Sequence, residues 1–435
     1  MEQNTPNWKR TFFLIWAGQS LSLVGSQMVH FAIAWWITES TGSAVVLGTM
    51  AIFGMLPQVV LGPFIGALVD RWNRQRVMII SDAIIAIITL GLAVLFFTGR
   101  IEHWHLYLTA LLRGTLGTFH WTAMQASTSL MVPKEQLSRV AGMNQTLQGV
   151  LNIAAPPLGA LVVGLLEMGP IMLIDVATAL LGITPLLFVR IPQPANVSKE
   201  LVTPKMVLRD VRDGLVYVKS WPGILMVLAS AALINFFLSP TGTLTPLLIT
   251  RHFEGGVWQL GTIQSAWGVG IIAGGLLLSI WGGFKKRIFT SMLSLSLMGI
   301  GVLIMGTAPK SMFMLAVAGN ALAGALNPMV NGPLFALLQD KIAPEMQGRV
   351  FTLVGSLAGA MTPLGIALAA PVSDALGIQV WWWIGGSFCV LIGPTMLAFK
   401  AVRGIEDTPS PKLPDVQAAP AAEPSELVQN PVPAD

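Results

Sequence analysis

The segment Gly66-Ala-Leu-Val-Asp70-Arg71-Trp72-Asn73-Arg74-Gln-Arg76 stands between two apolar stretches, 44–69 and 77–98. Its pattern returns in the second half of the chain as Gly275-x3-Ser279-x-Trp281, which is again followed by a basic cluster. An apolar stretch of roughly 20 residues is long enough to cross the hydrocarbon core of a bilayer. The repeated segment therefore indicates a membrane protein whose two halves share one topology.

Two further pairs of segments repeat in the same order. Pro133-Lys-Glu-Gln-Leu-Ser-Arg139-Val140 matches Pro344-Glu-Met-Gln-Gly-Arg349-Val350, and Pro157-Leu-Gly159 matches Pro363-Leu-Gly365. All three pairs lie roughly 210 residues apart, as internal repeats of a membrane bundle would. We therefore expect two six-helix bundles of one topology, related by an axis along the membrane normal.

The composition excludes a water-soluble globular protein. Of the 435 residues, 54% are hydrophobic and 11% are charged, whereas soluble domains carry about 25% charged residues. We therefore expect an all-α polytopic membrane protein. The single cysteine, Cys389, excludes an intramolecular disulfide. Trp8, Lys9 and Arg10 lead into the first apolar stretch without a cleavage site, so that stretch should remain attached.

Twelve apolar stretches are long enough to span the bilayer, six on each side of a central polar loop. The predicted spans are 11–37, 44–69, 77–98, 104–131, 139–166, 170–189, 224–250, 257–282, 288–307, 312–338, 348–376 and 380–399. They define a six-helix bundle over 1–189, a cytoplasmic linker over 190–221, a second six-helix bundle over 222–403 and a tail over 404–435.

The linker and the tail carry signals of their own. Residues 204–220 place apolar side chains at helical spacing, with Lys or Arg between them. This pattern is typical of an amphipathic helix on the inner membrane surface, and a partner-binding helix is the alternative. The end of the chain, 407–435, is rich in Pro, Ala and Glu, so we expect a disordered tail.

Basic residues set the expected orientation. Most of the 25 Lys and Arg residues fall on the side of the two termini, and the opposite side has only Arg100, Arg251 and Lys310. Because cytoplasmic loops collect Lys and Arg, both termini should be cytoplasmic. The net charge of +4 then reflects topology, and we expect no nucleic-acid partner. An aromatic belt on the opposite side is suggested by Trp35, Trp36, Trp104, Trp381, Trp382 and Trp383.

Several motifs resemble those of the major facilitator superfamily. The segment that ends at Arg76 resembles its signature loop between helices two and three, with Asn73 in place of the usual glycine. Arg113-x3-Gly117 resembles the helix-four motif of its drug exporters, and Ala155-Pro156-Pro157-Leu-Gly159-Ala160 resembles its antiporter motif, with alanines in place of two glycines. The resemblance implies two halves that rock about a midplane site.

A narrower resemblance is to the bacterial macrolide-efflux proteins, and it extends from about residue 8 to residue 403. It implies a protein of the bacterial cytoplasmic (inner) membrane. The segments that carry it are Trp16-Ala-Gly-Gln19, Thr38-Glu39-Ser-Thr-Gly42-Ser43-Ala44, Arg190-Ile-Pro192, Lys286-Arg287-Ile288 and Gly348-Arg349-Val350-Phe351.

The resemblance also implies a gate at the cytoplasmic face. The family's loop aspartate holds the inner gate closed, and here Asp70 should cap the helix that begins near Gly348 when the protein faces outward, because the helix dipole favours a carboxylate there. The alternative is that the loop serves only to orient the chain in the membrane through its basic residues. That alternative explains the arginines of the loop but not its aspartate. The residues expected to take part in gating are Gly66, Asp70, Arg71, Arg74, Arg139, Pro156, Pro157, Gly159 and Arg349.

Arg113 interrupts an apolar run. A guanidinium in hydrocarbon costs roughly 2.5–3.5 kcal/mol, so it should face a polar interior and pair with an intramembrane acid. The candidates are Asp175 and Asp82, and we favour Asp175 as the proton-carrying group. A purely structural ion pair is the alternative. Because an unperturbed histidine side chain can change charge near neutral pH, His30 and His120 can relay protons, or they can simply bond a neighbouring helix.

Uncharged polar side chains recur on the expected inward faces of the spans. Amides set among Met and Trp suit a large amphipathic ligand better than a sugar phosphate. The expected cavity residues are Gln19, Gln27, Arg113, Gln145, Gln148, Asn152, Asn235, Asn320, Asn327 and Asn331.

No catalytic or metal-binding pattern appears in the sequence. There is no P-loop for ATP and no Cys/His spacing of a metal site, so we expect no enzyme and no cofactor, with a proton gradient as the energy source. We expect a monomeric exporter that exchanges amphipathic drugs, above all macrolides, for protons within membrane lipid. The alternatives are an exporter or flippase of another amphipathic cargo, such as a siderophore or lysolipid, and a non-transporting sensor. The sequence leaves open whether a separate ATPase assists.

Overall fold

The computed structural model describes residues 8–189, 191–193, 212 and 214–408, and this part of the chain is helical with short connections. The long helices are α1 (Trp8–Thr41), α2 (Ala44–Val69), α3 (Arg74–Phe97), α4 (His103–Met131), α5 (Leu137–Leu165), α6 (Met168–Phe188), α8 (Pro222–Leu247), α9 (Val257–Trp281), α10 (Arg287–Thr307), α11 (Phe313–Lys341), α12 (Pro344–Leu376) and α13 (Val380–Ala398). The shorter elements are η1 (Lys134–Gln136), the π-helical turn η2 (Leu248–His252), η3 (Lys310–Met312) and α14 (Lys400–Arg403).

The long helices confirm the predicted spans. Among the described residues, 11 helices are long and apolar enough to cross a membrane. The twelfth, α4, is less apolar because Arg113 and His120 interrupt it, yet it packs against both α2 and α3. The predicted bounds differ from the helices by a few residues at most ends, and for α2 they agree at both ends.

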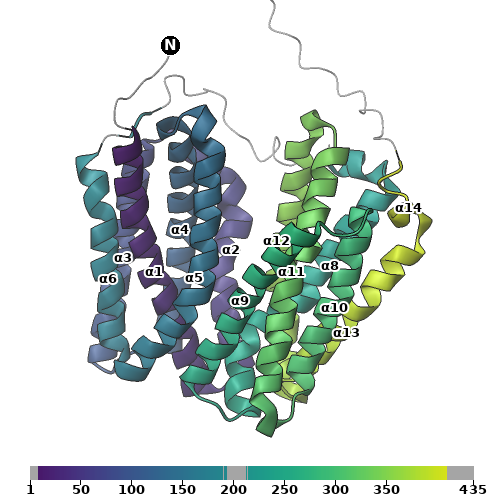
Figure 1. The fold of residues 1–435 in the computed structure, drawn as a ribbon. Helices are drawn as coiled ribbons and strands as arrows, with labels where there is room; N and C mark the ends of the chain where they lie inside the picture. The colour runs from purple at the N-terminus through teal and green to yellow at the C-terminus, as the bar shows by residue number, and fades with distance from the viewer. Residues whose placement is uncertain (1–7, 190, 194–211, 213, 409–435) are drawn as a thin grey trace, which may run out of the picture.

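The helices form two six-helix bundles, α1–α6 and α8–α13 (Figure 1). In the first bundle α1 packs against α6 and α2 against α4, and in the second α10 packs against α11 and α13. Figure 1 shows the bundles meeting at their lower ends and diverging upward, where α1 begins and α13 ends. We call the upper side the terminal face and the lower side the far face.

Two helix pairs make the most extensive contacts between the bundles, α2 with α12 and α5 with α9. These four helices carry the repeated segments, since α9 repeats α2 and α12 repeats α5. Their close contacts lie toward the far face. A Cβ on Gly48 of α2 would lie 3.0 Å from the side chain of Ile366, and one on Gly261 of α9 would lie 2.8 Å from Ala160. The same kind of crossing therefore holds the far face together twice.

Glycines set the close packing of α9 on α11 within the second bundle. A Cβ on Gly270 would overlap the backbone oxygen of Ala321, and one on Gly274 would overlap the backbone oxygen of Ala325. A helix backbone cannot move aside as the end of a flexible side chain can, so the two helices approach this closely only because these residues are glycine. This contact positions α11, which carries three of the predicted cavity asparagines.

Two predictions lie largely outside the described residues, namely the surface helix over 204–220 and the disordered tail. The described end of the linker, residues 214–219, is helical. However, Tyr217 and Val218 are buried, and the Tyr217 hydroxyl accepts a hydrogen bond from the Ala343 amide at 3.4 Å. This end of the linker is therefore packed on the second bundle and does not lie free on a membrane surface.

Candidate functional site

A cavity of about 1030 Å³ lies between the two bundles. Its walls come mainly from α1, α2, α4 and α5 of the first bundle and from α8, α9, α10 and α11 of the second. His30 lines it together with seven of the predicted cavity residues, which are Gln27, Arg113, Asn152, Asn235, Asn320, Asn327 and Asn331.

Three predicted cavity residues do not line the cavity in this conformation. Gln19 donates hydrogen bonds to the Asp82 carboxylate at 3.1 Å and to the Gly182 carbonyl at 3.2 Å, which draws it into the first bundle. Gln145 and Gln148 lie on the part of α5 between the cavity wall and the terminal face. Conversely, Gln264 of α9 lines the cavity and was missed by the sequence analysis, although an amide within an apolar span was the available signal.

The cavity wall is polar but carries little charge. Among the described residues that line it, the ionisable groups are Arg113 and His30, and no carboxylate is among them. Trp267, Met292 and Met298 add broad apolar surface. Such a wall offers hydrogen bonds and adaptable apolar contacts, but it offers no ion pair to a cationic ligand.

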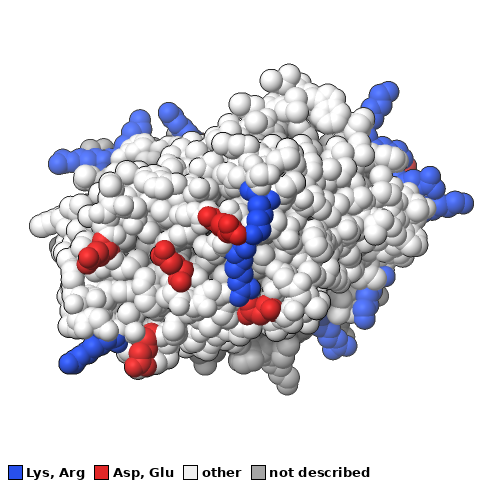
Figure 2. Space-filling view, turned by 90° about the horizontal axis from the view of Figure 1, so that it is seen from below, with Lys and Arg blue, Asp and Glu red and all other residues white. Residues whose placement is uncertain are grey.

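The cavity is reached from the terminal face. The two crossings close the bundles together at the far face, and Figure 1 shows them apart at the other end. Figure 2 views the molecule from the far face and shows a continuous, largely uncharged surface with no opening between the bundles. The described chain is therefore in the state that gives access from the terminal face.

Arg113 pairs with Asp175 behind the cavity wall. The Arg113 Nη1 lies 2.7 Å from the Asp175 Oδ2, and the Asp175 side chain is 2% exposed. Ser26 donates to the same carboxylate at 2.9 Å and Thr89 donates to it at 3.3 Å. Arg113 also donates to the Thr89 hydroxyl. Four helices of the first bundle thus surround one buried carboxylate, as a buried charge requires.

Asp82 has a different set of partners. Its Oδ2 lies 3.4 Å from the His120 Nε2, and it also accepts the hydrogen bond from Gln19. Asp82 lies near the start of α3, toward the terminal face, whereas Asp175 lies near the start of α6, toward the far face. The first bundle therefore holds two buried carboxylates at two depths, each with one basic partner.

The signature loop lies at the terminal face, and its aspartate, Asp70, is exposed there. The Asp70 carboxylate accepts a hydrogen bond from Arg74 at 3.1 Å and its side chain is 67% exposed. Arg74 is buried and also donates to the Ala126 carbonyl of α4 at 2.8 Å. Among the described contacts, Asp70 does not bind the start of α12, and the cap stays a prediction for the state closed on this side. The other predicted gating residues near this face are Gly66, Arg71, Arg139 and Arg349.

The proline pair of α5 lies at a crossing. Pro156 lines the cavity, and α5 stays helical through Pro156 and Pro157. A Cβ on Gly159 would lie 2.8 Å from the ring of Phe31 in α1, so this glycine permits the close approach that its motif suggested. The part that these three residues play in gating stays a prediction.

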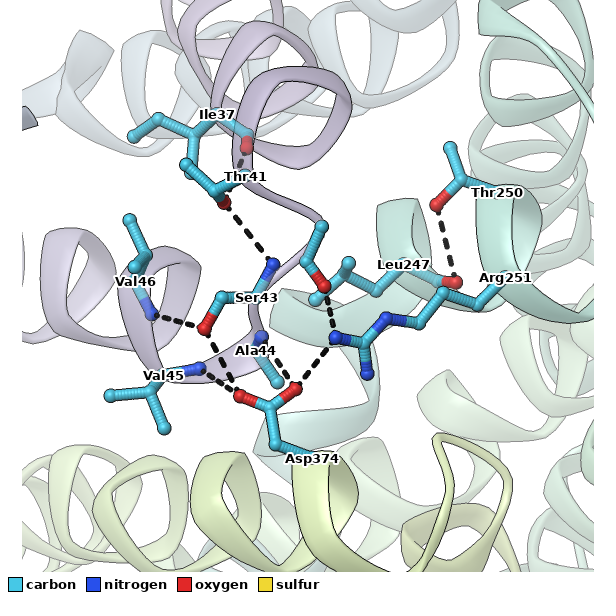
Figure 3. Close-up of polar contacts among 11 residues, drawn as sticks. Ile37, Thr41, Ser43, Ala44, Val45, Val46, Leu247, Thr250, Arg251 and Asp374 are labelled. Atoms are coloured by element: carbon cyan, nitrogen blue, oxygen red, sulfur yellow. Dashed lines mark hydrogen bonds and ion pairs between the residues drawn. The ribbon is translucent and has the colours of Figure 1, made fainter.

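One group of polar residues at the far face was missed by the sequence analysis. Asp374 of α12, Arg251 of η2 and Ser43 at the start of α2 form one cluster (Figure 3). Two signals were available. Gly42-Ser43 has the composition of a helix start, and Arg251 is one of the few basic residues expected on this side.

Comparison with known proteins shows which family the chain resembles. The model of the Major Facilitator Superfamily matches residues 15–361. The chain is 34% identical over 400 residues to macrolide efflux protein A of Streptococcus pyogenes, which covers 92% of this chain and 98% of the relative. It is 35% identical over 325 residues to macrolide efflux protein A of Enterococcus faecalis, covering 75% of this chain and all of the relative. It is 25% identical over 392 residues to the multidrug efflux pump Tap of Mycolicibacterium fortuitum, covering 88% and 94%.

Solved structures share the fold. The nucleoside transporter NupG has a TM-score of 0.68 at 14% identity, covering 90% of this chain and 99% of that one. A bacterial homologue of the iron transporter ferroportin, in an inward-facing state, has a TM-score of 0.68 at 14% identity, covering 91% and 99%. At this identity the likeness concerns the fold alone.

Proposed function

Because the chain belongs to the major facilitator superfamily, we propose that it exports macrolide antibiotics and related amphipathic drugs in exchange for protons. It is a multi-pass membrane protein and a drug efflux transporter, not an enzyme. Its substrate is a small molecule, and transporters of this family need no cofactor. Proton coupling, the preferred drug and the orientation in the membrane are the proposed parts.

The observation that carries the macrolide proposal is the cavity. Its volume of about 1030 Å³ stands at the upper end of ordinary ligand pockets, which hold about 300–1,000 Å³. Amides of both bundles provide hydrogen bonds, and methionines and tryptophans provide apolar contact. A large ring with many oxygens and a tertiary amine that can enter uncharged suits this wall. A permanent cation does not, because it would lie beside Arg113 without a carboxylate to pair with.

The Arg113–Asp175 pair supports a coupling mechanism. A proton that arrives from the far face neutralises Asp175 and weakens its ion pair with Arg113, since charge-assisted hydrogen bonds are the stronger kind. The guanidinium is then free to turn toward the cavity that it already lines. Loss of the proton toward the terminal face restores the pair. Asp82 and His120 lie on that side and form the exit route for the proton. His30 lines the cavity one turn beyond Ser26, which binds Asp175.

We place the protein in the bacterial cytoplasmic membrane with the terminal face toward the cytoplasm. The support is the basic residues, which concentrate on the side of the termini. In this orientation the described structure is inward-facing and ready to receive a drug from the cell. We propose that it works as a monomer within membrane lipid, since the two bundles of a single chain enclose a complete cavity.

Expression in a host that lacks its own efflux pumps should raise the inhibitory concentration of a macrolide at least about fourfold. A proton that moves down 100 mV supplies about 2.3 kcal/mol, and 1.4 kcal/mol sustains about a tenfold gradient. A protonophore should therefore abolish the protection. Susceptibility and accumulation of labelled macrolide measure this effect.

Tetraphenylphosphonium, a permanent cation, serves as the matched compound and should gain little protection. Unchanged macrolide susceptibility would contradict the proposed substrate, and resistance that survives the protonophore would contradict proton coupling. Stronger protection against the permanent cation than against the macrolide would contradict the argument from cavity charge.

Asp70→Asn should reduce export about tenfold or more while leaving the amount of protein in the membrane unchanged. Asn retains the size of Asp70 but lacks the charge that the dipole at the start of α12 favours, so the closed inner gate loses stability. Asp340→Asn is the control, because Asp340 is similarly exposed and pairs with Arg287 within the second bundle. Normal export by the Asp70 variant would remove the inner-gate hypothesis.

A further inference from the structure

Asp374 of the second bundle caps a helix of the first bundle (Figure 3). It lies in the last turn of α12, and one carboxylate oxygen, Oδ1, accepts a hydrogen bond from the Ala44 amide at 3.0 Å. The other oxygen, Oδ2, accepts from the Val45 amide at 3.0 Å and from the Ser43 hydroxyl at 3.1 Å. The contact therefore joins the two halves across the α2–α12 crossing.

These bonds complete the first turn of α2. The first amides of a helix have no partner within the helix. Ser43 is the N-cap of α2, and its hydroxyl accepts from the Val46 amide at 3.4 Å. The two amides before Val46 are those that Asp374 binds. The start of α2 thus depends on a carboxylate from the other bundle, and the dipole of α2 favours its negative charge.

Arg251 holds this carboxylate and reaches across the crossing as well. It belongs to η2, the π-helical turn that follows α8, and its Nη2 lies 2.8 Å from the Asp374 Oδ1. The same nitrogen donates to the Gly42 carbonyl of the first bundle. The side chains of Arg251 and Asp374 are 34% and 25% exposed, so the cluster lies at the rim where the far face would part.

We propose that Asp374 and Arg251 hold the far face closed, and that these contacts must break before the cavity can open to that side. Separation of α2 from α12 removes every hydrogen bond between Asp374 and the start of α2 at once. The other crossing has a different contact, since a Cβ on Gly164 of α5 would lie 3.0 Å from the Trp258 ring of α9. Among the described contacts, the charged closure thus belongs to the α2–α12 crossing.

The arrangement mirrors the one predicted for the terminal face. The helices α2 and α12 run in opposite directions, because α2 begins at the far face and α12 begins at the terminal face. Asp70 follows the end of α2, and Asp374 lies near the end of α12. Each helix therefore carries, near its end, a carboxylate suited to cap the start of the other.

Spin labels at Thr98 and Thr307 test the proposal on the purified full chain. Both residues are exposed at the far-face ends of α3 and α10, one in each bundle, and the native Cys389 is buried. Pulsed electron spin resonance reports the distance between the labels. In the wild type we expect one distance, that of the closed far face. Asp374→Asn should raise the population with a longer far-face distance about tenfold, and Arg251→Gln should raise it to a smaller extent.

Glu102→Gln is the matched control, since Glu102 is also a far-face carboxylate but binds the Trp104 indole within the first bundle at 2.9 Å. It should leave the distances unchanged. Unchanged distances in both the Asp374 and Arg251 variants, or the same change in the Glu102 variant, would overturn the proposal. Because the measurement needs neither drug nor proton gradient, its result is independent of the proposed substrate.

Discussion

Asp175→Asn is expected to abolish proton-driven export, with a loss of more than about tenfold in the initial rate, which corresponds to about 1.4 kcal/mol. Asparagine can still accept a hydrogen bond from Ser26, but it cannot bind and release a proton in turn. Export from proteoliposomes under an imposed pH gradient measures the coupled rate. Exchange of drug across the membrane without a gradient should persist, because Asp175 does not line the cavity.

Two companion variants separate coupling from folding. Removal of one partner from a buried ion pair leaves an unpaired charge and costs about 3–5 kcal/mol of stability. The double variant Arg113→Gln with Asp175→Asn removes both charges and should fold while remaining uncoupled. Asp82→Asn should reduce the coupled rate less than Asp175→Asn does. Coupled export that survives in the Asp175 variant and is lost in the Asp82 variant would assign the proton to the other carboxylate.

Gly274→Ala is expected to lower the yield of folded protein about tenfold or more. The new Cβ would overlap the backbone oxygen of Ala325, so α9 and α11 must move apart along their contact. Overpacking of an ordinary core costs about 1–3 kcal/mol, and here the obstacle is backbone. Fluorescence-detected size-exclusion chromatography of a tagged chain measures the folded fraction.

The adjacent glycine gives the control for this prediction. A Cβ on Gly275 would meet nothing within 4 Å. Gly275→Ala therefore makes the same chemical change one position along the same helix, and it should fold as the wild type does. Equal yields of the two variants would show that the packing of α9 on α11 tolerates more separation than the structure indicates.

The sequence predicts the spans well because every helix that crosses a membrane must be long and apolar enough to span the hydrocarbon core. Length and apolarity locate them, and even α4 is found, although Arg113 interrupts it. The partner of Arg113 cannot be chosen in this way, because Asp82 and Asp175 interrupt their apolar runs alike. Only the rotation of α3 and α6 about their axes decides between them, and that rotation depends on packing across the whole bundle.

Packing between helices also explains two other differences between the sequence-based predictions and the structure. The aromatic belt is wrong for Trp35, Trp381 and Trp382, which are buried. The Trp381 indole donates to the Phe237 carbonyl of α8 at 2.9 Å. Trp104, by contrast, is exposed, as a belt residue would be. The role of Asp374 was missed because its partners lie about 330 residues away in sequence. Contacts between the bundles join residues that are far apart in the sequence, so the local sequence pattern does not predict them.

The buried Arg113–Asp175 pair and the His120–Asp82 pair both belong to the first bundle, whereas most of the cavity asparagines belong to the second. In the proposed mechanism, proton coupling depends on the first bundle, whereas the cavity is shared and takes most of its asparagines from the second bundle. Under that mechanism, substitutions at the second-bundle asparagines can change the drug spectrum without touching either buried carboxylate pair.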